Sequence, residues 1–405
     1  MHKNMNHYFS IYQKIIGAVL TGVIFNTAPV LAQNSNDILK LIEQNNTQIE
    51  AARKALSATI TENKTGLNLK NPEVEWEHKW VSHTGGTQTN EVSVTQELDW
   101  SVISGQRKTL SRKKNELAEI TFLQTRNSVL LQAEKKLIEL SYYYRLLDEL
   151  HTQLQDADSL TQIYKTMLEN GNGNILNVNR SQLNSVAIQT EIKNINTQKK
   201  VVMEELAGLN GGKPVNYEER FTFRQPELPE DFDTWFKEII NHVPELRYYQ
   251  KDIEVKKQSL QSTKTDMIPG LSVGYAGEIN ESERLHGFIL GMSIPLWENK
   301  NKLKKSKQDI ITAQSNEYDA RLRVYSQLKA QYTQTIALRH TLHFQKDAID
   351  RLNTTSLMKE ALQKGEINLM DYLTETARYY EYRKNLLITE KDYLTALAEL
   401  YAFEL

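Results

Sequence analysis

The pattern of hydrophobic and polar positions changes period several times along the chain. Apolar residues at 37–70 recur at spacings of three, four and seven, which predicts an amphipathic helix ended by Pro72. Residues 73–100 alternate apolar and polar side chains around the turn at 82–86, which predicts a β-hairpin with strands of about 11 residues. Residues 106–170 contain neither Gly nor Pro and place Leu in sevens, which predicts one long helix with coiled-coil packing.

This series occurs twice, in the order helix, β-hairpin, long helix, turn and shorter helix. Because the two shorter helices of the first copy together match the long one in length, we expect them to lie end to end beside it. The predicted divisions are an export signal at 1–32, a first repeat at 33–210 with its hairpin at 73–100, a linker with one short strand at 211–232, and a second repeat at 233–405 with its hairpin at 269–297. The other predicted helices are 178–209, 232–267, 296–364 and 372–405.

The two turns, at 168–178 and 362–372, align with each other without a gap. Gly171 falls on Gly365, and Asn174 falls on Asn368. Glycine is typical of a helix end because the residue there usually has a positive φ. Each turn alone is explained by an ordinary helical hairpin, but the duplication of everything around them favours a shared function.

The predicted strands suggest a membrane sheet. Each hairpin has one apolar face, and the first carries Glu75, Glu77 and Glu91 on the other face. Strands of about 11 residues cross a bilayer when tilted. Four of the five Trp residues lie in or beside the strands, which is typical of an interfacial aromatic belt, namely Trp76, Trp80, Trp100 and Trp297. The alternative is a soluble sheet packed on a helix, but no amphipathic element is left over to cover it.

Four strands cannot close a barrel, and an open edge in lipid leaves backbone groups unpaired. We therefore expect the barrel to be shared between copies of the chain. Three copies would supply about 12 strands, whereas two would supply about eight, whose interior side chains usually fill.

The N-terminus resembles an export signal. Lys3 and Lys14 precede an apolar core at 15–25, and small residues precede the expected cleavage site before Gln33. The alternative, a retained membrane anchor, is disfavoured because the apolar core is shorter than the roughly 20 residues of a membrane span. The chain has no Cys, so we expect no disulfide, no thiolate metal site and no lipid-anchored N-terminus.

Composition and motifs narrow the function further. A net charge of −2 disfavours a basic nucleic-acid binder. We find no nucleophile elbow, phosphate loop or HExxH motif, so we expect no enzyme, no cofactor and no metal site. His340 and His343 share a helix face, but a solvated surface explains them better than a metal site.

The duplicated order resembles the outer-membrane efflux protein family, the TolC-like channels of Gram-negative bacteria. The resemblance includes the Ser-Ile-Pro-Leu-Trp run at 293–297 and the spacing from Gly171 to Asn177 and from Gly365 to Asp371. It implies a homotrimer with a 12-stranded barrel in the outer membrane and an α-helical tunnel in the periplasm. The implied partners are outer-membrane lipid, a periplasmic adaptor and an inner-membrane transporter, for which the RND type is favoured. The implied function is a passive exit duct for metal ions, drugs or other small molecules.

The resemblance also implies functional residues. The two turns would dock on the adaptor through Asn170, Gly171, Asn172, Lys364, Gly365 and Glu366. Well-known members carry Val-Gly-Leu or Val-Gly-Thr there, so we expect more polar docking. Asp371 matches a carboxylate that narrows the closed pore in some members, with Thr374 and Asn177 as further candidates. Asp371 also suits a plain helix cap, and both roles stay open.

The main rival interpretation is a periplasmic coiled-coil adaptor or structural protein with a soluble β-domain. Membrane fractionation separates the two, because a channel needs detergent for extraction and the rival is released by washing. An enzyme is a third alternative, which a nucleophile and base in one cavity would support.

Overall fold

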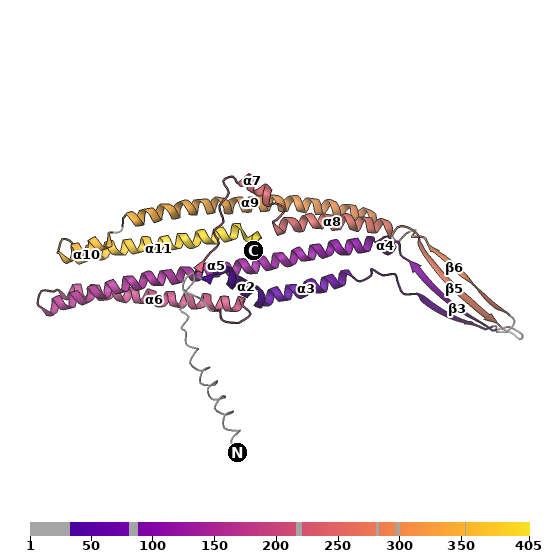
Figure 1. Ribbon diagram of the computed structural model, residues 1–405, viewed down its shortest axis with the longest axis horizontal. Helices are drawn as coiled ribbons and strands as arrows, with labels where there is room; N and C mark the ends of the chain where they lie inside the picture. Colours follow the sequence, from indigo (N-terminus) through magenta and orange to yellow (C-terminus); the bar gives the residue numbers. More distant parts are fainter. Residues whose placement is uncertain are drawn as a thin grey trace, which may run out of the picture.

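The computed structural model describes residues 33–80, 88–215, 221–280, 283–295, 297, 300–352 and 354–405. The described chain is an elongated rod of helices with a β-sheet at one end (Figure 1). The predicted export signal at 1–32 and the predicted turn at 82–86 lie outside the described residues. Within the described ranges, every helix is too short or too polar to span a lipid bilayer.

The helices of the first repeat follow the predicted order, except that the first is broken in two and a short helix precedes the long one. The predicted single helix at 37–70 is wrong, because the chain bends at Asn46, which has an extended backbone (φ −67°, ψ 124°). The Asn46 side chain accepts a hydrogen bond from the Ile49 N–H at 2.9 Å and donates one to the Leu209 carbonyl at 2.7 Å. The observed helices are α2 (Ser35–Asn45), α3 (Thr47–Asn63), α4 (Trp100–Ile103), α5 (Gln106–Glu169) and α6 (Ile175–Leu209).

The second repeat is more broken than predicted. Pro244 starts a new helix inside the predicted helix 232–267, because proline suits a first helical turn and disrupts a helix interior. The predicted helix 296–364 is interrupted after Arg351, beside a sequence of poor helix formers, Asn-Thr-Thr-Ser at 353–356. The observed elements are α7 (Phe232–Ile239), α8 (Pro244–Thr265), α9 (Lys302–Arg351), α10 (Thr355–Gln363), α11 (Leu369–Leu400) and the 3-10 turn η1 (Ala402–Glu404).

Both predicted hairpins are present, and they join into one sheet. Its strands are β2 (Glu73–Lys79), β3 (Thr89–Leu98), β5 (Gly270–Asn280) and β6 (Arg284–Ser293), all antiparallel to their neighbours in that order. β2 has 7 residues and is shorter than predicted. The short strand predicted in the linker is also present, since β4 (Phe221–Thr222) pairs in parallel with β1 (Gln33–Asn34).

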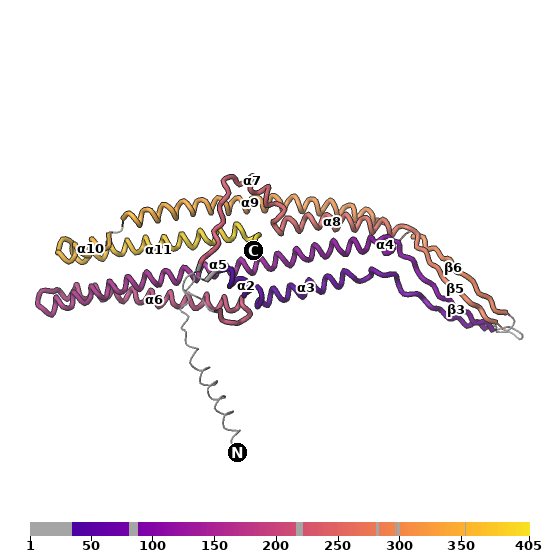
Figure 2. Tube along the Cα trace, in the orientation of Figure 1, coloured from indigo at the N-terminus to yellow at the C-terminus, as the bar shows by residue number. Residues whose placement is uncertain are grey.

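The shorter helices lie end to end beside the long ones, as their lengths predicted. α3 and α6 follow each other along α5, and α8 and α11 follow each other along α9 (Figures 1 and 2). At the joint of the first pair, the Asn45 amide donates to the Asn210 side-chain oxygen at 2.9 Å. Gly211 is required there, because its φ is positive and a Cβ would lie 2.4 Å from the Asn45 carbonyl oxygen.

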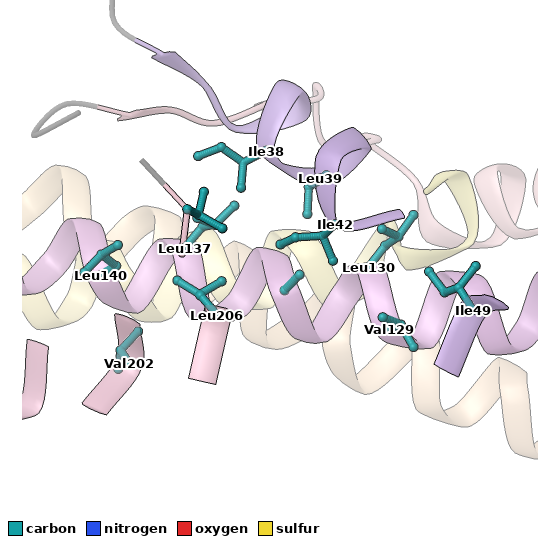
Figure 3. Close-up of a cluster of buried hydrophobic side chains, with 12 residues drawn as sticks. Ile38, Leu39, Ile42, Ile49, Val129, Leu130, Leu137, Leu140, Val202 and Leu206 are labelled. Carbon is teal, nitrogen blue, oxygen red and sulfur yellow. The ribbon is translucent and has the colours of Figure 1, made fainter. Parts of the chain in front are cut away.

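Buried side chains of α2, α5 and α6 form a core at the middle of the rod, where α2 packs against α5 (Figure 3). Two of the leucines predicted in sevens along α5, Leu140 and Leu147, are buried, and so are Leu150, Ala157 and Tyr164, which lie three positions after that register. Full burial of one such leucine stabilises the fold by about 1.5–3 kcal/mol. This core packs α2, α3 and α6 against α5 at the middle of the rod, between the sheet at one end and the turns at the other.

Candidate functional site

One face of the sheet is apolar and open to its surroundings. Strand register places Val92 and Val94 beside Gly277 and Tyr275, and Tyr275 beside Phe288, so these side chains share that face. Phe288 is 89% exposed and Leu290 is 84% exposed, which is unusual for large apolar residues. The other exposed members of this apolar face are Val74, Trp76, Val273, Ile279 and Met292.

The opposite face is polar and carries mostly carboxylates and small residues. Lys79 on this face lies 3.0 Å from Glu91 and 3.1 Å from Glu77. Gly274 admits no side chain, because a Cβ there would lie 2.7 Å from the Val94 carbonyl oxygen. The remaining acidic residues of the polar face are Glu73, Glu75, Glu97 and Glu278. Leu285 and Ile289 on β6 depart from this pattern.

The sheet stands clear of the helices. It projects beyond their ends, and no described helix covers either face (Figure 1). β2 and β6 are its edges, and neither pairs with a further strand among the described residues. At its base, the Trp100 indole N–H donates to the Pro269 carbonyl at 3.0 Å, and the Ser101 hydroxyl donates to Asp266 at 2.6 Å.

The two aligned turns have the same backbone structure. Gly171 (φ 73°) and Gly365 (φ 74°) take the positive φ that the sequence predicted. In the first turn, the Asn172 N–H donates to the Met167 carbonyl at 2.9 Å. In the second, the Glu366 N–H donates to the Ala361 carbonyl at 2.9 Å. Each glycine N–H also bonds the carbonyl three residues before it, so both turns form Schellman motifs.

The turns differ at the position after this motif. Gly173 of the first turn aligns with Ile367 of the second. A Cβ at Gly173 would lie 2.3 Å from the Leu168 backbone nitrogen, so the first turn is packed too closely for any other residue. The first turn is therefore tighter than the second, although their helix ends match.

Both turns lie at the end of the rod opposite the sheet (Figure 1). A buried cluster joins their helices, formed by Leu160, Tyr164, Val178, Leu369 and Tyr372. The predicted docking residues Asn170, Gly171, Asn172, Lys364, Gly365 and Glu366 are all exposed there. Lys364 also forms an ion pair with Glu360 at 2.5 Å, one turn earlier on α10. The end of the rod is therefore an exposed polar tip.

The candidate constriction residues lie just behind this tip. Asn368 caps α11 by accepting a hydrogen bond from the Asp371 N–H at 2.9 Å, and its amide donates to the Asp371 carboxylate at 2.7 Å. Asp371 is thus the third helical residue, paired with the cap. Thr374 follows it by three residues and is also exposed. Asn177 is half-buried in the first turn of α6.

Polar contacts tie α11 to the hairpin of α5 and α6 near the tip. The Tyr380 hydroxyl donates to Asp156 at 3.2 Å, and Lys359 lies 3.3 Å from the same carboxylate. Arg383 pairs with Glu149, and this hydrogen bond raises the pKa of the guanidinium. Burial, helped by Asp156, raises the pKa of Tyr380 well above its usual range, so its hydroxyl stays a donor.

Sequence reasoning missed these contacts. Tyr380 and Asp156 stand 224 positions apart in the chain, and neither belongs to a motif. Within the described part of the chain, no group of three or more metal-binding side chains occurs. His343 instead lies 3.2 Å from Asp347 on its own helix.

The sequence and the fold both have known relatives. Residues 235–403 match the family model of the outer membrane efflux protein. The fold is similar to that of the channel CusC, with a TM-score of 0.73, 13% identity and coverage of 92% of each chain. It is also similar to VceC from Vibrio cholerae, with a TM-score of 0.72, 12% identity and coverage of 91% of this chain and 95% of that one.

A third similar structure is the CmeC outer membrane channel of Campylobacter jejuni, with a TM-score of 0.70, 14% identity and coverage of 92% of this chain and 85% of that one. Comparison of the sequence with curated proteins found no match. The family model covers the second repeat, and the similar channels share the fold of both repeats. The second repeat therefore matches the outer membrane efflux protein family, and the fold is similar to that of these outer-membrane channels.

Proposed function

We propose that three copies of this chain form a passive exit duct through the outer membrane, in a tripartite efflux pump. The uncovered four-stranded sheet carries this proposal. It has an apolar face that no described helix covers and two edges, β2 and β6, that pair with no further described strand. Such a sheet is stable in lipid only when every edge is paired.

Pairing of β6 with β2 of the next copy would remove all edges and continue the antiparallel order. Three copies of four strands give 12 strands in one closed ring. A ring of eight strands from two copies would leave an interior that side chains usually fill. β3, β5 and β6 have 10, 11 and 10 residues, which fits the 9–11 residues or so of a strand that crosses a bilayer. The polar face then lines a water-filled passage.

The rods would continue this passage into the periplasm as a helical tunnel. α5 has 64 residues, so it extends about 95 Å at 1.5 Å per residue. The exposed polar tip would dock on a periplasmic adaptor, and an inner-membrane transporter of the RND type would supply the energy. The cargo we propose is a small molecule, such as a metal ion or a drug. The resemblance of the sequence to TolC-like channels supports these partners.

Reconstitution tests the duct. The protein should need detergent for extraction, migrate as a heat-sensitive oligomer and produce discrete conductance steps in a planar lipid bilayer. A periplasmic adaptor or structural protein with a soluble β-domain would instead be released by washing and would conduct nothing. Release by washing together with the absence of conductance would rule out the proposed duct.

Replacing Asp371 by alanine should increase the conductance of the closed channel and weaken its preference for cations. Three exposed carboxylates around one axis would attract cations and narrow the passage behind the tip. The measurement is single-channel conductance with its reversal potential in a salt gradient. Asp319→Ala, an exposed carboxylate on α9 away from the tip, is the control and should change neither. An unchanged reversal potential in Asp371→Ala would leave Asp371 only with its hydrogen bond to the helix cap Asn368.

Charge reversal at the second turn should weaken adaptor capture. Lys364→Glu and Glu366→Lys change exposed side chains without altering the glycine conformation between them. Rim charges act mainly on the rate of association, so we expect slower capture at low salt and a smaller difference at high salt. Crosslinking to the cognate adaptor measures this. Crosslinking at the wild-type rate in both variants would exclude these residues from the docking surface.

A further inference from the structure

The four helix ends nearest the sheet are basic. They are the stretch after α3 at 63–70, the start of α5 at 106–114, the end of α8 at 256–264 and the start of α9 at 302–307 (Figure 1). These stretches hold two, five, three and four Lys and Arg residues, and no Asp or Glu. The whole chain has 49 basic and 51 acidic residues, so this separation of charge is local. We name the Lys and Arg residues of the four stretches the basic collar.

Flanking carboxylates neutralise only part of the collar. Arg107 pairs with Asp99 at 2.6 Å, and Lys113 pairs with Glu254 at 3.1 Å. Three further members also pair with carboxylates, namely Lys70, Lys256 and Lys305. Asp99 is further occupied, because it accepts hydrogen bonds from two N–H groups at the start of α4.

Several members of the collar are exposed and form no ion pair with any described residue, and four of them fall in two pairs along α5 and α9. These four are Lys108 and Arg112 on α5, and Lys304 and Lys307 on α9. Spacings of four and three residues place the members of each pair on one helix face. Each helix therefore presents a basic stripe beside the sheet.

The stability of the helices does not explain these stripes. α5 and α9 both begin at the collar, and neither has an acidic residue in its first turn. A basic side chain near a helix N-terminus opposes the helix dipole, and two like charges on one face repel each other. The arrangement therefore costs the isolated chain stability, and an anion outside the chain would offset that cost.

The position of the collar indicates which anion. Between the collar and the middle of the sheet lie exposed apolar side chains, including Trp297 at 81%, Ile294, Ile268 and Ile103. Such residues are typical of the boundary between lipid tails and headgroups. The headgroup layer adds about 5–8 Å on each side of the hydrocarbon. Stretches of six and nine helical residues, as in α9 and α5, extend about 9 and 13 Å, which places the stripes at that depth and just beyond it.

We propose that the basic collar binds the phosphate groups of anionic glycerophospholipids in the leaflet that faces the helices. This inference rests on the proposed function, since it needs the sheet to lie in the membrane. Anionic lipid surfaces attract clustered Lys and Arg next to a membrane segment, and the attraction falls off within a Debye length. The collar would thereby fix the depth of the sheet in the bilayer.

Lipid retention by the purified oligomer tests the collar. The detergent-extracted protein is titrated with phosphatidylglycerol or phosphatidylcholine, and the retained lipids are counted by native mass spectrometry. We expect the wild type to bind phosphatidylglycerol about tenfold more tightly than phosphatidylcholine, with the difference shrinking as salt is added. The variant K108Q/R112Q/K304Q/K307Q should lose this preference and bind both lipids equally.

A matched control carries the same change in charge elsewhere. R180Q/K193Q/K200Q/K346Q removes four exposed basic residues from α6 and α9 away from the sheet, and it should keep the wild-type lipid preference. Equal binding of the two lipids by the wild type, or equal losses in both variants, would overturn the inference. A collar variant with unchanged lipid binding and altered ion preference would also overturn it, because the stripes would then line the passage.

Measuring pore formation distinguishes a failure of the lipid-binding proposal from a failure of the proposed duct. Both variants should still form conducting oligomers in a planar bilayer, because the strands and their edges are unchanged. Conducting oligomers without a lipid preference contradict the collar alone. A protein that neither conducts nor retains either lipid contradicts the duct and the collar together.

Discussion

Replacing Phe288 by arginine is expected to abolish insertion into the outer membrane, while replacing the adjacent Gly287 by arginine is expected to leave insertion intact. Phe288 lies in the middle of β6 on the apolar face and is 89% exposed. A side chain at Gly287 would point to the polar face, and a Cβ there meets nothing within 4 Å. The two changes add the same charge at neighbouring positions, and only the face differs.

The size of the effect follows from where the charge is placed. Arginine on the lipid face costs about 2–4 kcal/mol near the middle of the bilayer, and three copies would each bear that cost. A domain surrounded by water would not distinguish the two changes, since both side chains are solvated there. Membrane fractionation of the two variants, expressed at equal levels, measures the difference. Equal amounts of both in the membrane fraction would mean that the apolar face does not contact lipid.

The second large effect is expected at the tip. Removing the carboxylates of Asp156 and Glu149 together should raise the occupancy of the open channel about fivefold or more per chain. Asp156 accepts a hydrogen bond from Tyr380 on α11 and pairs with Lys359 on α10. Glu149 pairs with Arg383 on α11. The double variant therefore removes these three contacts between α5 and the helices α10 and α11, which we call ties. These side chains are partly exposed, so each tie contributes about 1 kcal/mol at most. Two or three ties in each of three copies still shift an opening equilibrium substantially.

A control pair lies on the same two helices at the other end of α11. Lys135 on α5 and Glu399 on α11 are 2.5 Å apart, and Glu399 is about 40 Å along the helix from Asp371 at 1.5 Å per residue. Glu399→Ala removes a similar tie without touching the tip, so it should leave the conductance unchanged. Equal increases in the two variants would point to a general loosening of the rod. No increase in Asp156→Ala/Glu149→Ala would mean that these contacts do not hold the tip closed.

Strand faces and register could be predicted from the sequence because apolar and polar side chains alternate along each strand, and only one pairing register keeps the apolar ones on one face. A shift of one residue would turn Val92 and Val94 to the polar face, so the apolar face fixes the hairpin. The glycine turns were equally predictable, since Gly171 and Gly365 each follow the end of a helix and precede an asparagine cap. These features depend on residues close together in the sequence.

The sequence did contain signals for the helix breaks. The prediction missed them because it relied on the apolar spacing, which continues across each break. Pro244 and Asn46 are typical first-turn and capping residues, yet the apolar spacing continues past both. Asp371 was correctly placed at a helix start, but Asn368 provides the cap. The contact of Tyr380 with Asp156 could not be predicted, because it depends on how two separate hairpins pack.

Disulfide crosslinking between the two edges of the sheet tests the shared ring most directly. The chain has no Cys, so a cysteine at Glu75 on β2 can be combined with one at Leu285, Gly287 or Ile289 on β6 without any background. Within one chain these edges are three strand spacings apart, about 14 Å, which no disulfide spans. In membranes, we predict that one of the three pairs oxidises to a covalent trimer. Folded, membrane-embedded protein that stays monomeric in all three pairs would contradict the account.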